Sequence, residues 1–113
     1  MSSADTIAMQ ADAQEQAVSG QMLENAALTT QYLKSLAHPA RLVILCRLAE
    51  GPISVGELES MLELPQAAVS KQLARLREDG LVDCRREGRS IVYMLADDRT
   101  RRIIRALYDE FCS

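Results

Sequence analysis

The apolar pattern of the chain begins only after a polar stretch. Residues 1 to about 20 are mainly Ser, Ala, Gln, Asp and Glu with little apolar periodicity, which predicts a mobile or weakly helical arm. From Met22 onward apolar residues recur at helical spacing as far as Ala37, which predicts a first amphipathic helix. We expect this helix to stop at His38, because Pro39 disfavours helical backbone in the residue before it.

Two short helices are predicted next. The apolar positions after Pro39 indicate a second helix that ends at Gly51-Pro52, the usual order of a glycine C-cap and a following proline. Ser54 and Glu57 have the spacing of a capping box, in which the serine accepts from the Glu57 amide and the carboxylate reaches back. The sequence therefore predicts a third helix that starts at Ser54.

A fourth helix with one dry face is predicted over residues 66–79. Val69, Leu73 and Leu76 fall at i, i+4 and i+7 and share that face, and Gly80 ends the helix. The turn before this helix is tight, because Leu64-Pro65 is all that separates it from the third. Such a pair of helices is typical of a helix-turn-helix.

A hairpin and a last helix complete the pattern. Extended runs over 81–86 and 89–95 flank Glu87-Gly88, whose glycine can take the positive φ that a tight hairpin needs. Asp97-Asp98 places acids at the start of the last helix. Its strongly apolar stripe consists of Ile103, Ile104, Leu107, Tyr108 and Phe111. The predicted fold is mainly α with a small β-wing, a dimeric winged helix-turn-helix, with an arm over 1–20 and the domain over 21–113.

Composition adds the cellular setting. The 113 residues suffice for one domain, and neither a basic region followed by an apolar run nor about 18 consecutive apolar residues occurs, so we expect a cytoplasmic protein without a membrane span. The net charge of −3 is unevenly distributed. Residues 66–90 hold six basic and four acidic residues, whereas residues 1–30 hold four acidic and no basic ones. This local excess of positive charge favours nucleic-acid binding, because local electric fields, rather than the net charge, steer a nucleic acid to a protein surface.

The polar face of the fourth helix and the hairpin arginines form a candidate DNA-reading surface. Small and polar side chains opposite the dry face let the helix approach base edges, while the arginines suit phosphates. The candidate DNA-binding residues are Gln66, Ser70, Lys71, Gln72, Arg75, Arg85, Arg86 and Arg89. An isolated helix of this kind could equally be a solvated amphipathic helix, but the arginine-rich hairpin that follows favours DNA.

Four motifs carry a family resemblance. The segments Leu36–Leu42, Pro65–Leu73, Arg75–Val82 and Arg85–Arg89 resemble the ArsR/SmtB family of prokaryotic repressors, over about residues 22–112. The resemblance implies a homodimer built on the first and last helices, a double-stranded DNA operator read by the fourth helix and the wing, and release by an inducer. Ala67 and Ala68 stand where the family often has hydroxyl residues, so the base contacts carry over for Gln66, Ser70 and Lys71.

The metal-sensing branch of that family does not fit. Its members carry a Cys-x-Cys in the third helix or paired His and acidic ligands in the last, and a closed zinc site needs about four ligands. The sequence has neither pattern, and its single histidine, His38, is interpreted as a helix cap. We expect no metal and no cofactor.

Two of the three cysteines match a thiol switch. Cys46 and Cys112 resemble the cysteine pair of the sulfide- and persulfide-responsive branch, in which the two sulfurs, joined directly or through extra sulfur atoms, would link the second helix to the last. The inducer would be a reactive sulfur species or another oxidant. The alternative is packing, with Cys46 a small core residue and Cys112 a frayed end. For Cys84, on the first hairpin strand, packing is favoured.

Three functions stay open at this point. The leading one is a thiol-switched transcriptional repressor, the second a regulator of the same fold without a thiol switch, and the third a dimeric interaction module that does not read DNA. An enzyme is not expected, since no Ser/His/Asp, paired-carboxylate or phosphate-loop pattern is present. The basic segment 66–90 separates the first two functions from the third, and the cysteine pair separates the first from the second.

Overall fold

The computed structural model describes the backbone of residues 13–112 and the side chains of residues 20–112. By its contacts the chain falls into two units, which divide between Lys34 and Ser35. The predicted arm lies partly outside the described residues, and its boundary at residue 20 stays a prediction. No helix in the described part of the chain combines the length and the apolar character needed to cross a membrane.

Helix α2, Ala13–Leu36, runs through the described part of the first unit, and its last two residues, Ser35 and Leu36, belong to the second. It begins well before Met22, the predicted start, because Ala, Gln and Glu are good helix formers even without an apolar stripe. It ends at Leu36, before the predicted stop at His38. Four of its large apolar side chains are exposed, namely Met22, Leu23, Leu28 and Leu33, whereas Leu36 at its end is buried.

Helix α3, Pro39–Leu48, is the central helix of the second unit and contacts α4, α5, α6 and β3. His38 is its N-cap, and the Nδ1 atom of His38 accepts from the Ala40 amide at 3.1 Å, which confirms the capping role predicted for this histidine. Ile44, Leu45 and Leu48 are fully buried. These three residues share one broad face of α3, because each residue advances about 100° around a helix, and this face forms part of the core of the second unit.

Helices α4, Val55–Leu62, and α5, Gln66–Glu78, form the helix-turn-helix. Ser54 caps α4 as predicted, accepting from the Glu57 amide at 3.2 Å. The Glu57 carboxylate accepts from the Ser54 hydroxyl at 2.9 Å, whereas the usual capping box uses the serine amide. The turn between the helices contains Glu63 with φ of 53°, a left-handed residue that the sequence did not predict.

The end of α5 follows the prediction closely. Gly80 has φ of 78°, the Gly80 amide donates to Arg77, and the Leu81 amide donates to Leu76 at 2.9 Å. This bond from C″ to C3 is typical of a Schellman cap, in which glycine takes the left-handed position without a steric cost. Leu76 is fully buried together with Val69 and Leu73, which confirms the dry face of the predicted fourth helix.

The wing is an antiparallel hairpin of β2, Val82–Glu87, and β3, Ser90–Leu95. Its turn is Gly88-Arg89, one residue later than predicted, and Gly88 has φ of 63°. A short strand β1, Ile53–Ser54, pairs with β3 and gives the sheet order β1-β3-β2. The sequence did not predict β1, because two residues are too few for an alternating pattern.

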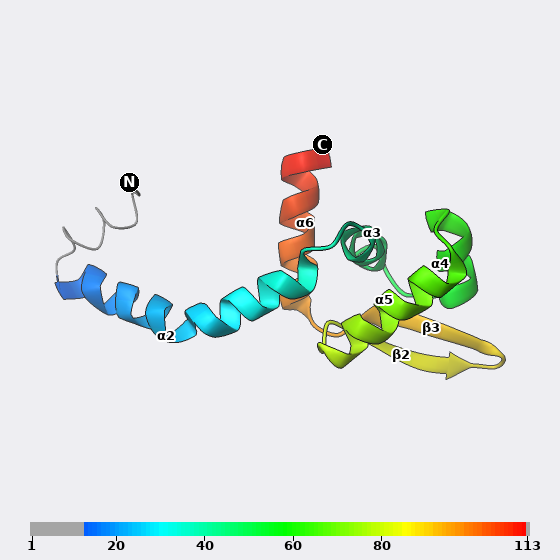
Figure 1. Cartoon of the computed structure of the whole chain (residues 1–113), viewed down its shortest axis with the longest axis horizontal. Coiled ribbons are helices and arrows are strands. Elements are labelled where there is room, and N and C mark those ends of the chain that lie inside the picture. The colour runs from blue at the N-terminus through cyan, green and yellow to red at the C-terminus, as the bar shows by residue number, and fades with distance from the viewer. Residues whose placement is uncertain (1–12, 113) are drawn as a thin grey trace. The chain divides into compact units, whose positions relative to one another are not determined.

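Helix α6, Asp98–Cys112, follows the wing. Asp97 accepts from the Thr100 amide at 3.0 Å, so the predicted acidic start of this helix is confirmed as a cap. Of the predicted apolar stripe only Ile104 is fully buried, whereas Leu107, Tyr108 and Phe111 are exposed. The order of elements and the β2–β3 wing give a winged helix-turn-helix, as the sequence predicted (Figure 1).

Candidate DNA interface and thiol pocket

The exposed face of α5 carries the residues that the sequence selected for base reading. Gln66, Ser70, Lys71 and Arg75 are all exposed. Ala67 and Ala74 are exposed among them, and their small side chains leave room for close approach. Val69, Leu73 and Leu76 lie on the opposite side of α5 and are buried. Residues three or four positions apart share one face of an α-helix, so the polar residues between these three point outward.

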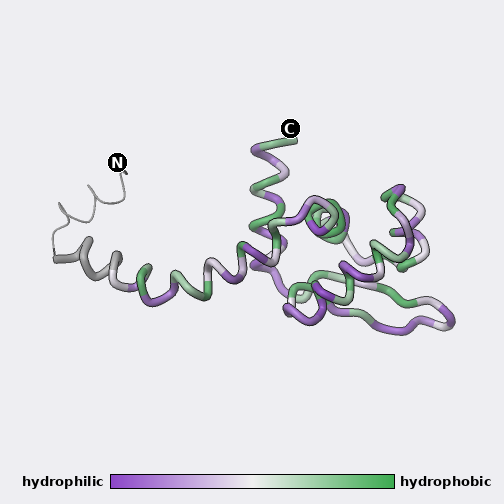
Figure 2. Tube along the Cα trace, viewed as in Figure 1, coloured by the Kyte–Doolittle hydropathy of each residue, from purple (hydrophilic) through white to green (hydrophobic). Residues whose placement is uncertain are grey.

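The wing adds a second positive surface beside α5. Strand β2 contacts α5, and Arg85, Arg86 and Arg89 are exposed on the strand and the turn. Figure 2 shows β2 and the turn as largely hydrophilic, while β3 carries more apolar residues. The structure therefore places the helix residues and the wing arginines on adjacent elements of one unit, although 10 residues of sequence separate Arg75 from Arg85.

The three wing arginines differ in their partners. Arg85 Nε donates to Glu87 Oε2 at 2.5 Å, a pair two residues apart on one face of β2. Within residues 20–112, Arg86 and Arg89 have no such ion pair. A phosphate can meet Arg86 or Arg89 directly, whereas it must compete with Glu87 for Arg85.

Gln72 is placed differently from the other seven candidates. It is half-buried, and its Oε1 atom accepts from Arg41 Nε at 2.8 Å. The side chain therefore faces α3, where Arg41 lies, and contributes to packing between the two helices. Sequence periodicity could not show this contact, because Arg41 and Gln72 lie on different helices.

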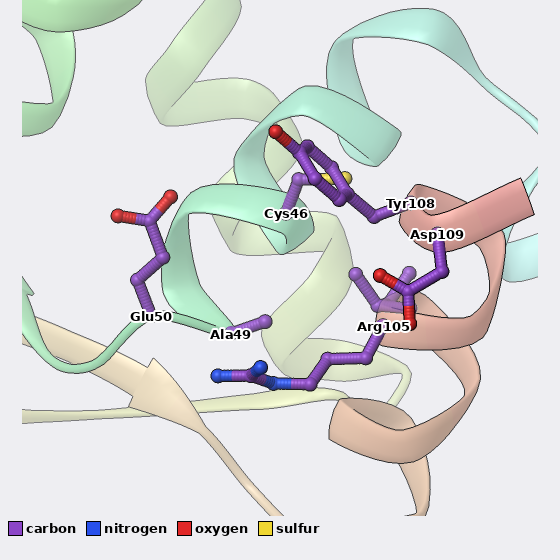
Figure 3. Close-up of a pocket in the computed structure, with 7 residues that line it drawn as sticks. Cys46, Ala49, Glu50, Arg105, Tyr108 and Asp109 are labelled. Carbon is purple, nitrogen blue, oxygen red and sulfur yellow. The ribbon is translucent and has the colours of Figure 1, made fainter. Parts of the chain in front are cut away.

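A pocket of about 210 Å³ lies between α3 and α6 and contains the first cysteine of the predicted pair. It is lined by Cys46, Ala49, Glu50, Ile104, Arg105, Tyr108 and Asp109. In Figure 3 the Tyr108 ring lies near the Cys46 side chain, with the carboxylates of Glu50 and Asp109 at the two sides. The spacings Cys46 to Glu50 and Ile104 to Tyr108 are both i to i+4, which is the signal in the sequence that could have identified these lining residues.

The two cysteines of the pair are both free thiols. Cys46 is half-buried and Cys112 is exposed. Burial raises the pKa of the Cys46 thiol, and the nearby Cys112 and Glu50 raise it further because their negative charges oppose a thiolate. Cys46 therefore differs at rest from the low-pKa thiolates that make many cysteines reactive.

Cys84 lies in a different environment. It is half-buried on β2 and faces Tyr93 of β3 across the hairpin. Burial raises the pKa of Tyr93, the charge of Cys84 raises it further, the Arg77 guanidinium lowers it, and a hydrogen bond with the Cys84 side chain raises it. These contacts agree with the packing role favoured for Cys84.

Within residues 20–112, no group of three or more His, Cys, Asp or Glu side chains is arranged to hold a metal ion. The chemistry that this part of the chain offers is that of exposed cations, a polar helix face and three free thiols.

Comparisons with known proteins agree with this arrangement. The winged helix-turn-helix and its exposed basic face define a DNA-binding regulator. The sequence profile described as "Bacterial regulatory protein, arsR family" matches residues 38–83. The biofilm growth-associated repressor of Agrobacterium fabrum is 56% identical over 81 residues, which cover 72% of this chain and 69% of that protein.

Two solved structures show the same fold. The transcriptional repressor BigR from Xylella fastidiosa superposes with a TM-score of 0.78 at 40% identity, covering 83% of this chain and 96% of that one. Reduced HlyU from Vibrio cholerae gives a TM-score of 0.77 at 42% identity, covering 82% and 98%. The chain belongs to the arsR family of bacterial regulatory proteins, and it is a DNA-binding transcriptional regulator.

Proposed function

We propose that this regulator is a homodimeric repressor that leaves its operator when Cys46 and Cys112 are bridged by a reactive sulfur species. The observation that carries the proposal is that Cys46 of α3 lines a pocket against α6, the helix that ends at Cys112. Helix α3 also packs against α5, so the thiols act on the helix that supports the reading helix. The relatives named as repressors support the direction of regulation.

In the reduced state, α5 reads the operator sequence and the wing contacts the phosphate backbone of the DNA. Gln66, Ser70 and Lys71 face base edges in the major groove, with Arg75 at the flank. Arg86 and Arg89 contact phosphates, which carry most of the sequence-independent affinity. Arg85 joins them when phosphate displaces Glu87, and the polar Gln72 supports α5 from the side of α3.

The switching chemistry needs no metal and no cofactor. The thiolate of one cysteine attacks the outer sulfur of a persulfide RSSH, the RS⁻ thiolate leaves, and the cysteine becomes Cys–SSH. The second thiolate then attacks the cysteine sulfur and HS⁻ leaves, which produces a disulfide. Further transfer of sulfur atoms lengthens the bridge, which suits a pair too far apart for a direct disulfide, since that needs Cα atoms roughly 4.4–6.8 Å apart.

A homodimer accounts for the apolar residues that the folded chain leaves in solvent. Leu23 is 79% exposed on α2 and Phe111 is 82% exposed on α6. Such apolar area is typical of a protein interface, and a two-fold dimer presents two reading helices to a palindromic operator. We expect a dimeric mass by sedimentation at micromolar concentration, and a Phe111→Glu variant should shift toward monomer, whereas Glu110→Gln should not.

The switch is tested by persulfide treatment of single-cysteine variants bound to operator DNA. Cys46→Ser and Cys112→Ser should bind the operator as the reduced wild type does and show no release, while Cys84→Ser should bind and release normally. Intact mass and peptide mapping should locate the bridge within one subunit. Release of Cys46→Ser by persulfide would contradict the paired-thiol switch and favour a regulator without it.

A further inference from the structure

One arginine joins three parts of the second unit. Arg41, in the first turn of α3, has a side chain only 14% exposed. Its Nε atom donates to Gln72 Oε1 of α5 at 2.8 Å, and its Nη1 atom donates to the Ser35 carbonyl near the end of α2 at 3.1 Å. The same Nη1 atom lies 3.9 Å from Asp79 Oδ2, at the C-cap of α5. Arg41 therefore contacts the reading helix at its middle and at its end.

The other contacts of α5 leave its orientation less closely defined. Val69, Leu73 and Leu76 bury the dry face, but apolar packing is not directional. A hydrogen bond is directional, and Gln72 lies next in sequence to Lys71 and two residues from Ser70. Because each residue advances about 100° around a helix, fixing Gln72 also fixes where Ser70 and Lys71 point.

The same arginine is on the helix that carries Cys46. Helix α3 spans only Pro39–Leu48 and packs against both α5 and α6. A bridge from Cys46 to Cys112 on α6 would pull on α3, and a short helix moves as one body. The arginine at its start would then move relative to Gln72.

We propose that Arg41 is the positioning residue that holds α5 in its DNA-reading orientation and transmits movement of α3 to it through Gln72. The inference rests on the proposed function for its second half, since the movement follows from the thiol bridge. Its first half stands on the Arg41–Gln72 contact alone.

The test uses the full-length protein and a duplex selected by reduced wild type from a random library. Arg41→Met, Gln72→Leu and the double variant are compared in their affinity for this duplex and for a scrambled one. Arg47→Met is the matched control, because it removes an α3 arginine whose Nη1 atom donates to the Gly51 carbonyl, beyond the end of its own helix. Gln72→Glu keeps the acceptor for Arg41.

Arg41→Met should weaken binding to the selected duplex about tenfold, the effect of one lost charge-assisted hydrogen bond, and leave the scrambled duplex nearly unchanged. The double variant should lose no more than the larger single loss, and Gln72→Glu should retain the discrimination between duplexes. Arg47→Met should behave as wild type. Additive losses in the double variant, or equal losses on both duplexes, would overturn the positioning role.

Glutathione persulfide separates the two halves of the inference. Wild type and Arg47→Met should release the selected duplex, and Gln72→Leu should show a much smaller change in affinity after bridging, confirmed by intact mass. If wild type is bridged and released and Gln72→Leu is released by the same factor, transmission through Gln72 is wrong. If wild type is not released, the proposed switch fails, while the discrimination measurements still decide the positioning role.

Discussion

The proposed DNA surface and the thiol pocket belong to the same unit, but the first is exposed to solvent and the second is partly buried. On α5 and the wing, Ser70, Lys71 and Arg89 are exposed to solvent and accessible to DNA. At the junction of α3 and α6, Cys46 is half-buried, and burial together with nearby negative charge raises the pKa of its thiol. The proposed DNA contacts thus use polar and cationic groups in solvent, whereas the proposed switch uses a thiol whose charged form its surroundings disfavour.

One helix, α3, lies against both regions. No residue of the proposed DNA surface lines the thiol pocket. Helix α3 contacts both α5 and α6, with Arg41 on the side of α5 and Cys46 in the pocket against α6. In the proposed switch, a change at the thiols would reach the DNA surface through the packing and hydrogen bonds of α3, so single substitutions on α3 should alter the response.

The largest expected effect on the DNA side comes from a base-reading residue. Ser70→Ala should cost about 1–3 kcal/mol on the operator and little on a scrambled duplex, because a lost base contact removes discrimination. Fluorescence anisotropy with both duplexes measures the difference. Equal binding of Ser70→Ala and wild type to the operator would show that α5 does not read DNA through this face.

A smaller effect should separate two arginines of the wing. Arg89→Ala should weaken all duplexes alike and reduce the slope of log K against log salt by about 0.9, the contribution of one phosphate. Arg85→Ala should reduce it less, because Glu87 already competes for that guanidinium. Titrations at several salt concentrations measure both slopes, and a larger reduction for Arg85→Ala would contradict the distinction between paired and unpaired arginines.

The smallest effect concerns the thiol pocket and its pH dependence. Only the thiolate reacts, and the pKa of Cys46 is raised by burial, Cys112 and Glu50, so alkylation of Cys46 should keep accelerating with pH above the range where a free thiol levels off. Iodoacetamide modification of a Cys84→Ser variant, followed by peptide mass spectrometry that quantifies Cys46 separately from Cys112, measures this rate. Glu50→Gln should shift the profile modestly toward lower pH, whereas Glu59→Gln should not.

Local signals in the sequence determined most of the secondary structure. Pro39 with His38, Ser54 with Glu57, and Gly80 after α5 each mark a helix end through contacts made within a few residues. The dry face of α5 and the exposure of Ser70 and Lys71 followed from the helical period alone. Short-range chemistry of this kind is readable because its partners are neighbours in the chain.

Tertiary structure decided what depends on partners distant in sequence. It brought Gln72 of α5 into a hydrogen bond with Arg41 of α3 and paired β1 with β3. It also placed Glu50 and Tyr108 in the pocket that Cys46 lines. It also set the raised pKa of Cys46, since burial and nearby charges exist only once α3 and α6 pack together. A one-dimensional pattern reports which face of an element is apolar, but which element covers that face, and with which polar contacts, is fixed only in three dimensions.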